Sequence, residues 1–240
     1  MTREQMHKEF KLLMDKAGEG GSPSFLSSEI DRFLNIAQNK FVSKRAFGNN
    51  VRRTSFEEDQ KRRDDLRMLI AEHSGEIISN NSNDKKPNSY FFVLPDNYRH
   101  SINEEALIYS TNSPTTNYTS LRRVPVKPIT YDRYNKIMDD PFNKPTKDTV
   151  YRLDFGEYNS SETDSTDYKG SFELITGEKQ SISKYYLRYL KNPLDISKDQ
   201  DCILSKHTHR EIVRMAVVDA LETVEQPRYQ SSKIELNEIE

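Results

Sequence analysis

The sequence has no tryptophan and only one cysteine, Cys202, among its 240 residues. A single cysteine excludes an internal disulfide framework, so packing and hydrogen bonds must hold the fold together. No apolar run approaches the roughly 18 residues that a membrane-spanning helix needs, and the charged start, MTREQMHKEF, lacks the apolar region of a signal peptide. These absences predict a protein that is kept in a cytosol-like space and has no membrane partner.

The sequence also lacks an excess of positive or negative charge. The chain carries 36 Lys and Arg against 38 Asp and Glu, a net charge of -2, which gives no overall attraction to nucleic acid. Only 34% of the residues are hydrophobic, so a sparse core must balance the entropy of the chain. The composition therefore fits either a polar monomer with long loops or a subunit that neighbours help to stabilise. The 13 tyrosines favour assembly slightly, because tyrosine suits partly wet interfaces.

Motifs of catalysis are absent as well: the sequence has no P-loop, G-x-G-x-x-G, H-E-x-x-H or C-x-x-C. Two sets of residues could hold a metal ion. Cys202, His207 and His209 offer at most three ligands near the start of a helix, and Asp139 and Asp140 are adjacent carboxylates. The favoured alternative is a packed or capping His209 and a solvated turn at the two aspartates. We therefore predict no metal, no cofactor and no enzymatic activity.

Short basic runs could contact DNA phosphates. They are Lys44-Arg45, Arg52-Arg53, Lys61-Arg62-Arg63 and Arg122-Arg123. Acidic residues interleave with the third run, which is typical of a solvated helix face with pairs four residues apart. We therefore predict no sequence-specific binding of DNA.

Helical periodicity dominates residues 2 to about 74, with a break from Gly18 to Pro23. The apolar stripes are Met6, Phe10, Leu13 and Met14 in a first helix and Leu26, Ile30, Phe33, Leu34, Ala37 and Phe41 in a second. Ser55 and Glu58 form a capping box, which predicts a third helix with Leu66, Leu69 and Ile70 inside.

The apolar period changes to two after the turn-rich segment 79–89. The predicted strands are Tyr90–Leu94, Ala106–Ser110, Leu121–Val126, Val150–Phe155, Phe172–Ile175 and Ile182–Leu190. A short helix with Thr130 as its N-cap is expected at Tyr131–Met138. Asp140-Pro141-Phe142 is expected to end it and to turn the aromatic ring back into the core.

A last apolar helical stripe ends near Pro227. Its members are Ile212, Val213, Ala216, Val217, Ala220, Leu221 and Val224. The order of elements predicts an α+β fold, in which N-terminal helices and a C-terminal helix form a bundle with a β-rich insertion between them. The expected domains are 1–78 with 205–226 as the bundle, 79–204 as the insertion and 227–240 as a C-terminal arm.

Several stretches occur in an order and spacing that resemble a known family. They are Tyr131–Tyr134, Asp140–Pro145, Val150–Leu153, Tyr186–Pro193 and His209–Val213. This set is similar to a structural ring protein of crAss-like bacteriophages, as are the helices around Phe10 and Phe41 and the run Lys61–Leu66. The resemblance spans nearly the whole chain, although no single motif is diagnostic.

The resemblance implies a structural subunit of the virion neck with no catalytic residues to carry over. Such proteins stack as rings of about twelve copies below the portal, and their design is similar to the portal adaptor proteins of short-tailed phages. The implied partners are copies of itself, the portal or an adjacent ring protein, other tail components and passing genomic DNA. Synthesis is expected in the bacterial host cytoplasm. The alternatives are a tail-hub or capsid-associated protein, or a metal-dependent host-directed enzyme that uses Cys202, His207 and His209.

Contacts between subunits are predicted on the last strand and on the arm. From Tyr185 to Leu190 the side chains alternate, which suits a strand that lies between a core and a neighbour. An arm of this kind becomes ordered when it binds. The expected contact residues are Tyr186, Arg188, Pro227, Arg228 and Tyr229.

Overall fold

The computed structural model describes residues 1–17, 25–47, 56–75, 78–79, 86, 88–110, 121–158 and 169–223. These residues fall into two compact units. The helical unit comprises the described residues of Met1–Leu69 and Pro193–Glu240, and the sheet unit comprises those of Ile70–Asn192. No helix in these ranges is long and apolar enough to cross a membrane.

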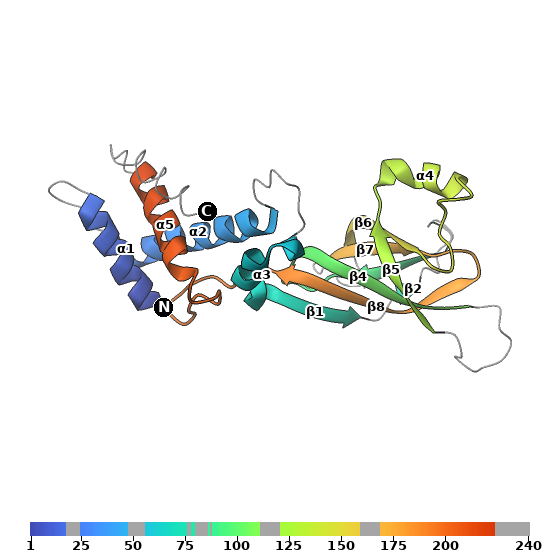
Figure 1. Ribbon diagram of the computed structural model, residues 1–240, viewed down its shortest axis with the longest axis horizontal. Helices are drawn as coiled ribbons and strands as arrows, with labels where there is room; N and C mark the ends of the chain where they lie inside the picture. The colour runs from blue at the N-terminus through green and yellow to red at the C-terminus, as the bar shows by residue number, and fades with distance from the viewer. Residues whose placement is uncertain are drawn as a thin grey trace. The chain divides into compact units, whose positions relative to one another are not determined.

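The helical unit is built mainly on three helices (Figure 1). They are α1 (Arg3–Ala17), α2 (Ser27–Phe47) and α5 (His209–Thr223), while the short α3 (Gln60–Leu66) lies between the 3-10 turns Phe56–Glu58 and Arg67–Leu69. Both α1 and α2 pack against α5. These helices bury most of the apolar stripes that a 3.6-residue period predicts; the buried residues include Met6, Phe10, Ile30, Leu34, Phe41, Ile212, Val213 and Ala216. Leu26, expected in the second stripe, precedes α2 and is 67% exposed.

The sheet unit contains eight strands and one helix, α4 (Tyr131–Asp139). The strands are β1 (Ile70–Gly75), β2 (Ile78–Ser79), β3 (Ser89–Val93), β4 (Tyr98–Ser110), β5 (Arg122–Pro128), β6 (Val150–Tyr158), β7 (Lys169–Ile175) and β8 (Gln180–Lys191). Their order in the sheet is β1-β8-β4-β5-β6-β7-β3-β2. Only the pair β5–β6 is parallel, because α4 carries the chain back between them as a crossover.

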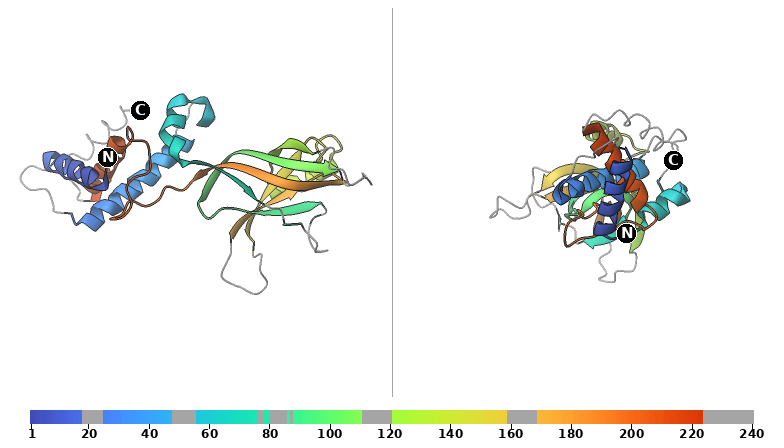
Figure 2. Two further views of the ribbon diagram at one scale, coloured as in Figure 1. Left: turned by 90° about the horizontal axis from the view of Figure 1, so that it is seen from below. Right: turned by 90° about the vertical axis from the view of Figure 1, so that its left-hand side faces the viewer.

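The sheet curls on itself. β1 and β2 stand at opposite ends of the strand order although they follow each other in the chain. A Cβ atom on Gly75, at the end of β1, would lie 2.6 Å from a ring carbon of Phe92 on β3. The glycine therefore allows these distant strands to approach. Figure 2 shows the curled sheet from a second direction, with β8 running beside β4.

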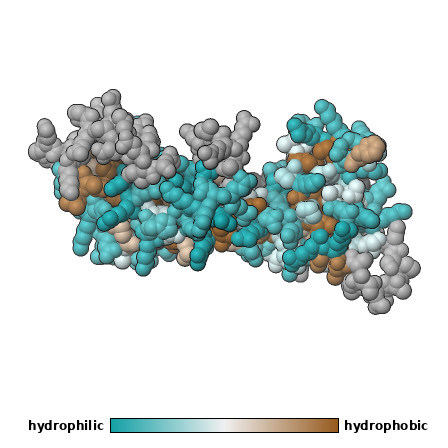
Figure 3. Space-filling model, in the orientation of Figure 1, coloured by the Kyte–Doolittle hydropathy of each residue, from teal (hydrophilic) through white to brown (hydrophobic). Residues whose placement is uncertain are grey.

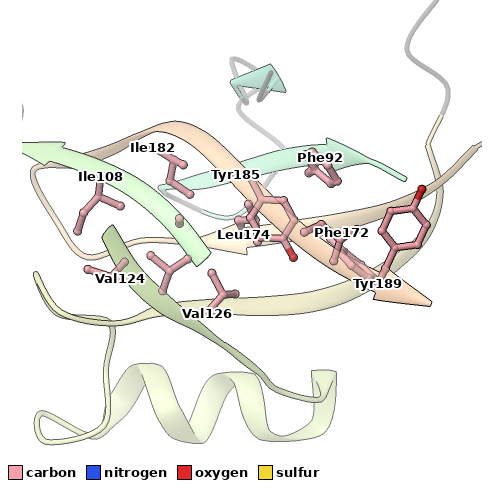
Figure 4. Close-up of a cluster of buried hydrophobic side chains, with 12 residues drawn as sticks. Phe92, Ile108, Val124, Val126, Phe172, Leu174, Ile182, Tyr185 and Tyr189 are labelled. Carbon is pink, nitrogen blue, oxygen red and sulfur yellow. The ribbon is translucent and has the colours of Figure 1, made fainter. Parts of the chain in front are cut away.

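The concave side of the sheet holds the main apolar core (Figure 4). The rings of Phe92 and Tyr185 lie 4.5 Å apart between centroids, and the rings of Tyr98 and Phe172 meet edge to face at 5.7 Å. Other members of this core are Ala106, Ile108, Val124, Val126, Val150, Leu174, Ile182, Leu187 and Tyr189. Aromatic pairs of this kind stabilise a core beyond the burial of their apolar area.

Helix α4 packs on the sheet through apolar contacts and through interactions with Lys86. Its residues Tyr134, Ile137 and Met138 pack on a second cluster formed by Tyr151, Leu153 and Ile175. The Lys86 ammonium lies 4.2 Å from the ring centre of Tyr131 and 4.5 Å from that of Tyr134. It also lies 2.8 Å from the buried carboxylate of Glu173. Burial and the negative charge of Glu173 raise the pKa of Tyr131 to about 12.

We expect Lys86→Met to loosen α4, because it leaves Glu173 without its cation and removes two cation–π contacts. The stability of the α4 attachment should fall by about 1–2 kcal/mol. Amide hydrogen exchange in α4 measures this loss. The control is Lys136→Met, which removes an exposed lysine of α4 itself. Equal exchange in the two variants would contradict the role of Lys86.

The predicted fold class, a helical bundle with a β-rich insertion, is wrong. The predicted third helix ends at Leu66 after seven residues, and Ile70, expected on its inner face, begins β1 and pairs with Leu190. Strand pairing therefore overrides an apolar spacing that suits a helix. The described residues of the sheet unit form a curled eight-stranded sheet instead.

The prediction that a capping box of Ser55 and Glu58 starts the third helix is also wrong. α3 is capped by Asp59, whose carboxylate accepts a hydrogen bond from the Lys61 amide at 2.9 Å, and Ser55 lies outside the described residues. α4 begins after Thr130 as predicted, although the Thr130 side chain makes no capping hydrogen bond. The six predicted strands are confirmed as parts of β3 to β8, although the predicted Ala106–Ser110 covers only the end of β4.

Candidate subunit interface

β8 presents a different chemistry on each of its two faces. Tyr185, Leu187 and Tyr189 point into the core and are buried, whereas Tyr186 is half-buried and Arg188 is exposed. This alternation follows from the two-residue period of a strand. Pairing with β1 and β4 then sets which side chains lie beside the two outward residues.

The outward side chains form a charged hollow of about 460 Å³, which we call the Tyr186 surface. It comprises Glu72, Asn103, Glu105, Arg123, Tyr186 and Arg188. The Arg123 guanidinium lies 4.2 Å above the centre of the Tyr186 ring and 3.3 Å from the Glu105 carboxylate. Tyrosine and arginine side chains that reach the surface in such an arrangement are typical of protein interfaces. The structure thus brings Tyr186 and Arg188 together, whereas Pro227, Arg228 and Tyr229 lie outside the described residues.

The turn that follows α4 holds an aromatic ring in the solvent. The Asp140 carboxylate accepts hydrogen bonds from the Phe142 amide at 2.9 Å and from the Asn143 side-chain amide at 2.6 Å. The Tyr151 hydroxyl donates to the Asn143 carbonyl at 2.6 Å. Hydrogen bonding from the Phe142 amide and from Asn143 lowers the pKa of Asp140. The turn is therefore fixed at both ends.

The prediction that Phe142 packs in the core is wrong, because its side chain is 92% exposed. The reason is the Asp140 side chain, which closes a local turn with the two residues that follow Pro141. In the view of Figure 3 most of the described surface is hydrophilic, with apolar side chains in separate groups. An exposed phenylalanine on a fixed turn is thus a candidate contact that the sequence analysis missed.

The candidate metal ligands are engaged with other groups. Cys202, His207 and His209 line one hollow of about 1050 Å³, but each has its own partner. The Cys202 thiol donates to the Gln38 side chain at 3.1 Å. The His207 ring lies 2.7 Å from the Asp65 carboxylate, and the His209 ring lies 2.8 Å from the Leu204 carbonyl. His209 also contacts the Met1 ammonium at 2.8 Å, and burial lowers its pKa. No group of three or more His, Cys, Asp and Glu side chains suited to a metal ion occurs within the described ranges.

We expect Cys202 to react with an aromatic disulfide reagent at least about tenfold more slowly in the folded protein than in urea. The thiol is only 7% exposed, and burial raises its pKa, so little reactive thiolate is present. Absorbance of the released thiolate measures the rate. Equal rates in both states would contradict the packing of Cys202.

Arg45, which belongs to one of the basic runs, is buried inside the helical unit. Arg45 is buried and contacts the carboxylates of Asp65 and Glu211, each at 2.9 Å. It therefore links α2, α3 and α5 and is not available to DNA. Arg122 and Arg123 are exposed, but both are paired, with Asp148 and Glu105. Arg52 and Arg53 lie outside the described residues.

Comparison with known proteins shows the family of this chain. A family model described as phage tail ring protein 3/4 matches residues 1–231. The chain belongs to this family. It is 24% identical to "Ring protein 3" of Bacteroides phage crAss001, over 90% of this chain and 94% of that protein. It is 25% identical to "Ring protein 4/5" of the same phage, over 90% of this chain and 91% of that protein.

Family membership confirms the resemblance to ring proteins of crAss-like phages. The chain is therefore a virion structural ring protein. The relatives carry structural names, which favours a role other than catalysis. The finer likeness to portal adaptor proteins stays a prediction.

Proposed function

We propose that this protein is a ring subunit of the head–tail connector that extends the portal channel and docks the next tail component. The observation that carries the proposal is the family match over residues 1–231, which covers both structural units. The Tyr186 surface and the exposed turn at Phe142 support it further, because a ring subunit needs places where it meets its neighbours.

In this proposal about twelve copies close a ring through head-to-tail contacts, in which two different surfaces of the subunit meet. The partners are copies of the chain, the portal or an adjacent ring protein, and other tail components. Genomic DNA passes without specific binding, which agrees with a net charge of -2. The subunit is made in the cytoplasm of the bacterial host and is then built into the neck of the virion.

Two parts of the chain are proposed to make contacts in the ring. Tyr186 and Arg188 lie on the Tyr186 surface and would face a neighbour. Pro227, Arg228 and Tyr229 belong to the proposed arm at 227–240, which would reach an adjacent subunit or ring. The arm supplies no catalytic group or cofactor site in this proposal.

Counting copies in purified virions tests the proposal. Quantitative mass spectrometry with isotope-labelled peptides, calibrated on the portal protein, should give about twelve copies per particle. Hundreds of copies would indicate a capsid-associated protein instead. A count well below that of the portal would indicate a tail-hub protein, and either result would overturn the connector role.

A further inference from the structure

The helix α2 has one long side that faces solvent. A shallow hollow of about 780 Å³ runs along this side, and we call it the α2 groove. Most of the residues that line it are exposed, and all of them belong to the helical unit. The lining consists of Ser28, Asp31, Arg32, Asn35, Ile36, Asn39, Lys40, Ser43 and Asp195.

Hydrogen bonds hold the second wall of the groove, residues 194–196, against α2. The Asn35 side chain donates to the Ile196 carbonyl at 3.1 Å and accepts from the Ile196 amide at 2.7 Å. The side chain of Gln38, which is fully buried, donates to the Leu194 carbonyl at 2.9 Å. The groove is therefore formed before anything binds in it, which lowers the entropic cost of binding.

Exposed aliphatic side chains gather at the α2 groove. Ile36, in its lining, is 38% exposed. Leu194, next to Asp195 in the chain, is 56% exposed, and Leu26, two residues before Ser28, is 67% exposed. One exposed apolar residue is ordinary, but several of them at one groove are typical of a binding surface.

The charges of the lining favour an acidic ligand. Arg32 and Lys40 are exposed cations. The Asp31 carboxylate is already paired with Arg3 at 2.6 Å, so Asp195 is the one exposed carboxylate in this lining. An acidic segment with aliphatic side chains therefore matches the α2 groove in both charge and hydrophobicity.

The arm proposed at 227–240 follows a helix that ends beside this groove. Figure 1 shows α5 against α2. The Lys40 ammonium lies 2.7 Å from the Asp219 carboxylate of α5, and the Thr223 hydroxyl donates to the Asp219 carbonyl at 2.9 Å. Thr223 is the last residue of α5, so the chain leaves α5 within about one helical turn of a residue that contacts the lining.

The arm is long enough to reach every part of the groove. The 17 residues 224–240 span roughly 55 Å when extended, whereas the lining of α2 from Ser28 to Ser43 is about 22 Å long. The sequence of residues 233–240, KIELNEIE, has three aliphatic side chains and three glutamates against one lysine. This is the acidic, aliphatic chemistry that the groove favours.

We propose that residues 233–240 of a free subunit lie in the α2 groove of the same chain, and that the arm leaves this groove when it binds a neighbour in the ring. The inference rests on the proposed function for that later contact and deepens it, because it states where the arm is held before assembly. A short tether gives a segment an effective concentration of about a millimolar, so in dilute solution the arm of the same chain outcompetes the arm of another copy.

Photo-crosslinking of the full-length chain tests the contact. A chain with p-benzoylphenylalanine in place of Ile36 is diluted until light scattering shows monomers. Isotopically light and heavy copies are then mixed and irradiated, and the adducts are mapped by mass spectrometry. We expect links within one chain to residues 228–240. The same group in place of Leu12, which is exposed on α1, should give no links to the arm.

The other outcomes of the crosslinking each contradict the proposal. Adducts from position 36 only to other parts of the chain, or no adducts, would overturn the contact. Links between light and heavy copies would place the arm of another copy in the groove and would also overturn it. None of these results changes the number of copies per virion, so the proposed function stands or fails separately, on that count.

Truncation gives a quantitative test. A lysine-specific protease cuts after Lys233 only while the arm is out of the groove, so the rate of release of residues 234–240 follows that population. Ile36→Ala should raise this rate by about three- to tenfold. Leu12→Ala is the matched control, because it also shortens an exposed leucine-sized side chain of the helical unit. Equal rates in the two variants, with unchanged thermal unfolding, would overturn the proposal.

A double-mutant cycle tests the match of charges. Arg32→Glu should also speed the release of residues 234–240, because it places a carboxylate against the acidic arm. It should have no further effect in a chain whose Glu235, Glu238 and Glu240 are replaced by glutamine. Arg63→Glu, at an exposed arginine of α3, is the control. An Arg32→Glu variant that behaves like this control would overturn the proposed contact.

Discussion

Replacing Arg152 by alanine is expected to lower the free energy of unfolding of the sheet unit by about 3–5 kcal/mol. Arg152 is 8% exposed and Glu104 is 7% exposed, and their charged groups are in direct contact. The Tyr185 hydroxyl donates to the second carboxylate oxygen of Glu104 at 2.8 Å. Removing the arginine leaves a buried carboxylate without its cation, which is far more costly than losing an exposed pair.

The network of Arg152, Glu104 and Tyr185 also changes the pKa of the tyrosine. Burial and the nearby carboxylate of Glu104 raise the pKa of Tyr185 above its ordinary range. The Arg152 guanidinium also lies 4.2 Å from the centre of the Phe172 ring, so it connects the polar network to the apolar core. We infer that this network fixes how β4, β6 and β8 pack inside the curled sheet.

Urea unfolding, followed through amide exchange in β4 and β8, measures the effect of Arg152→Ala. Arg123→Ala is the control, because Arg123 lies outside and its pair with Glu105 is exposed; we expect a change within about 0.5 kcal/mol. The double variant Glu104→Gln with Arg152→Met should recover much of the loss, since no buried charge remains and Tyr185 keeps an acceptor. A small effect of Arg152→Ala would show that the network is dispensable.

The second large effect is expected in the helical unit. Phe10→Ala should lower the free energy of unfolding of this unit by about 3–5 kcal/mol, because it leaves a cavity in a packed core. The Phe10 ring is fully buried and lies 5.9 Å from the Phe25 ring and 6.3 Å from the Phe33 ring, between centroids. Thermal unfolding followed by the helical circular dichroism signal measures the loss.

Leu12→Ala provides the comparison for Phe10→Ala. Leu12 lies on the same helix, but 54% of its surface is exposed. Its truncation removes little buried area, so we expect a change within about 0.5 kcal/mol. If both variants were equally stable, the packing of α1 through Phe10 would be contradicted.

The helices and strands with a clear apolar period could be predicted from the sequence. The stripes that contain Phe10 and Ile30 form buried faces of two helices, and the segments around Phe92 and Leu174 form strands. Side chains that face the core recur with the period of their element, so the sequence shows which element it is. β1 could not be predicted in this way. Its segment, Ile70–Gly75, has an exposed centre, and what makes it a strand is pairing with β8, which is distant in sequence.

Side chains whose environment depends on distant partners were the hardest to place. Arg45 stands in a basic run that suggests solvent, yet Asp65 and Glu211 approach it from other helices and bury it. Phe142 shows the reverse, since an apolar residue suggests the core. The residues around Phe142 could have corrected its placement, because Asp140, Pro141 and Asn143 are residue types that favour a surface turn. Tyr186 and Arg188 lie on the face of β8 opposite to Tyr185, Leu187 and Tyr189, as the alternation predicts. Their role as contacts between subunits stays a prediction.

We propose that this chain forms a ring in the neck of a phage particle. A symmetry-resolved electron cryomicroscopy reconstruction of the neck of intact virions tests it most directly. We predict a ring of density below the portal in which each subunit fits a curled eight-stranded sheet with α4 on its surface. A neck whose density is fully explained by other proteins, with this chain found in another part of the particle or in none, would contradict the claim.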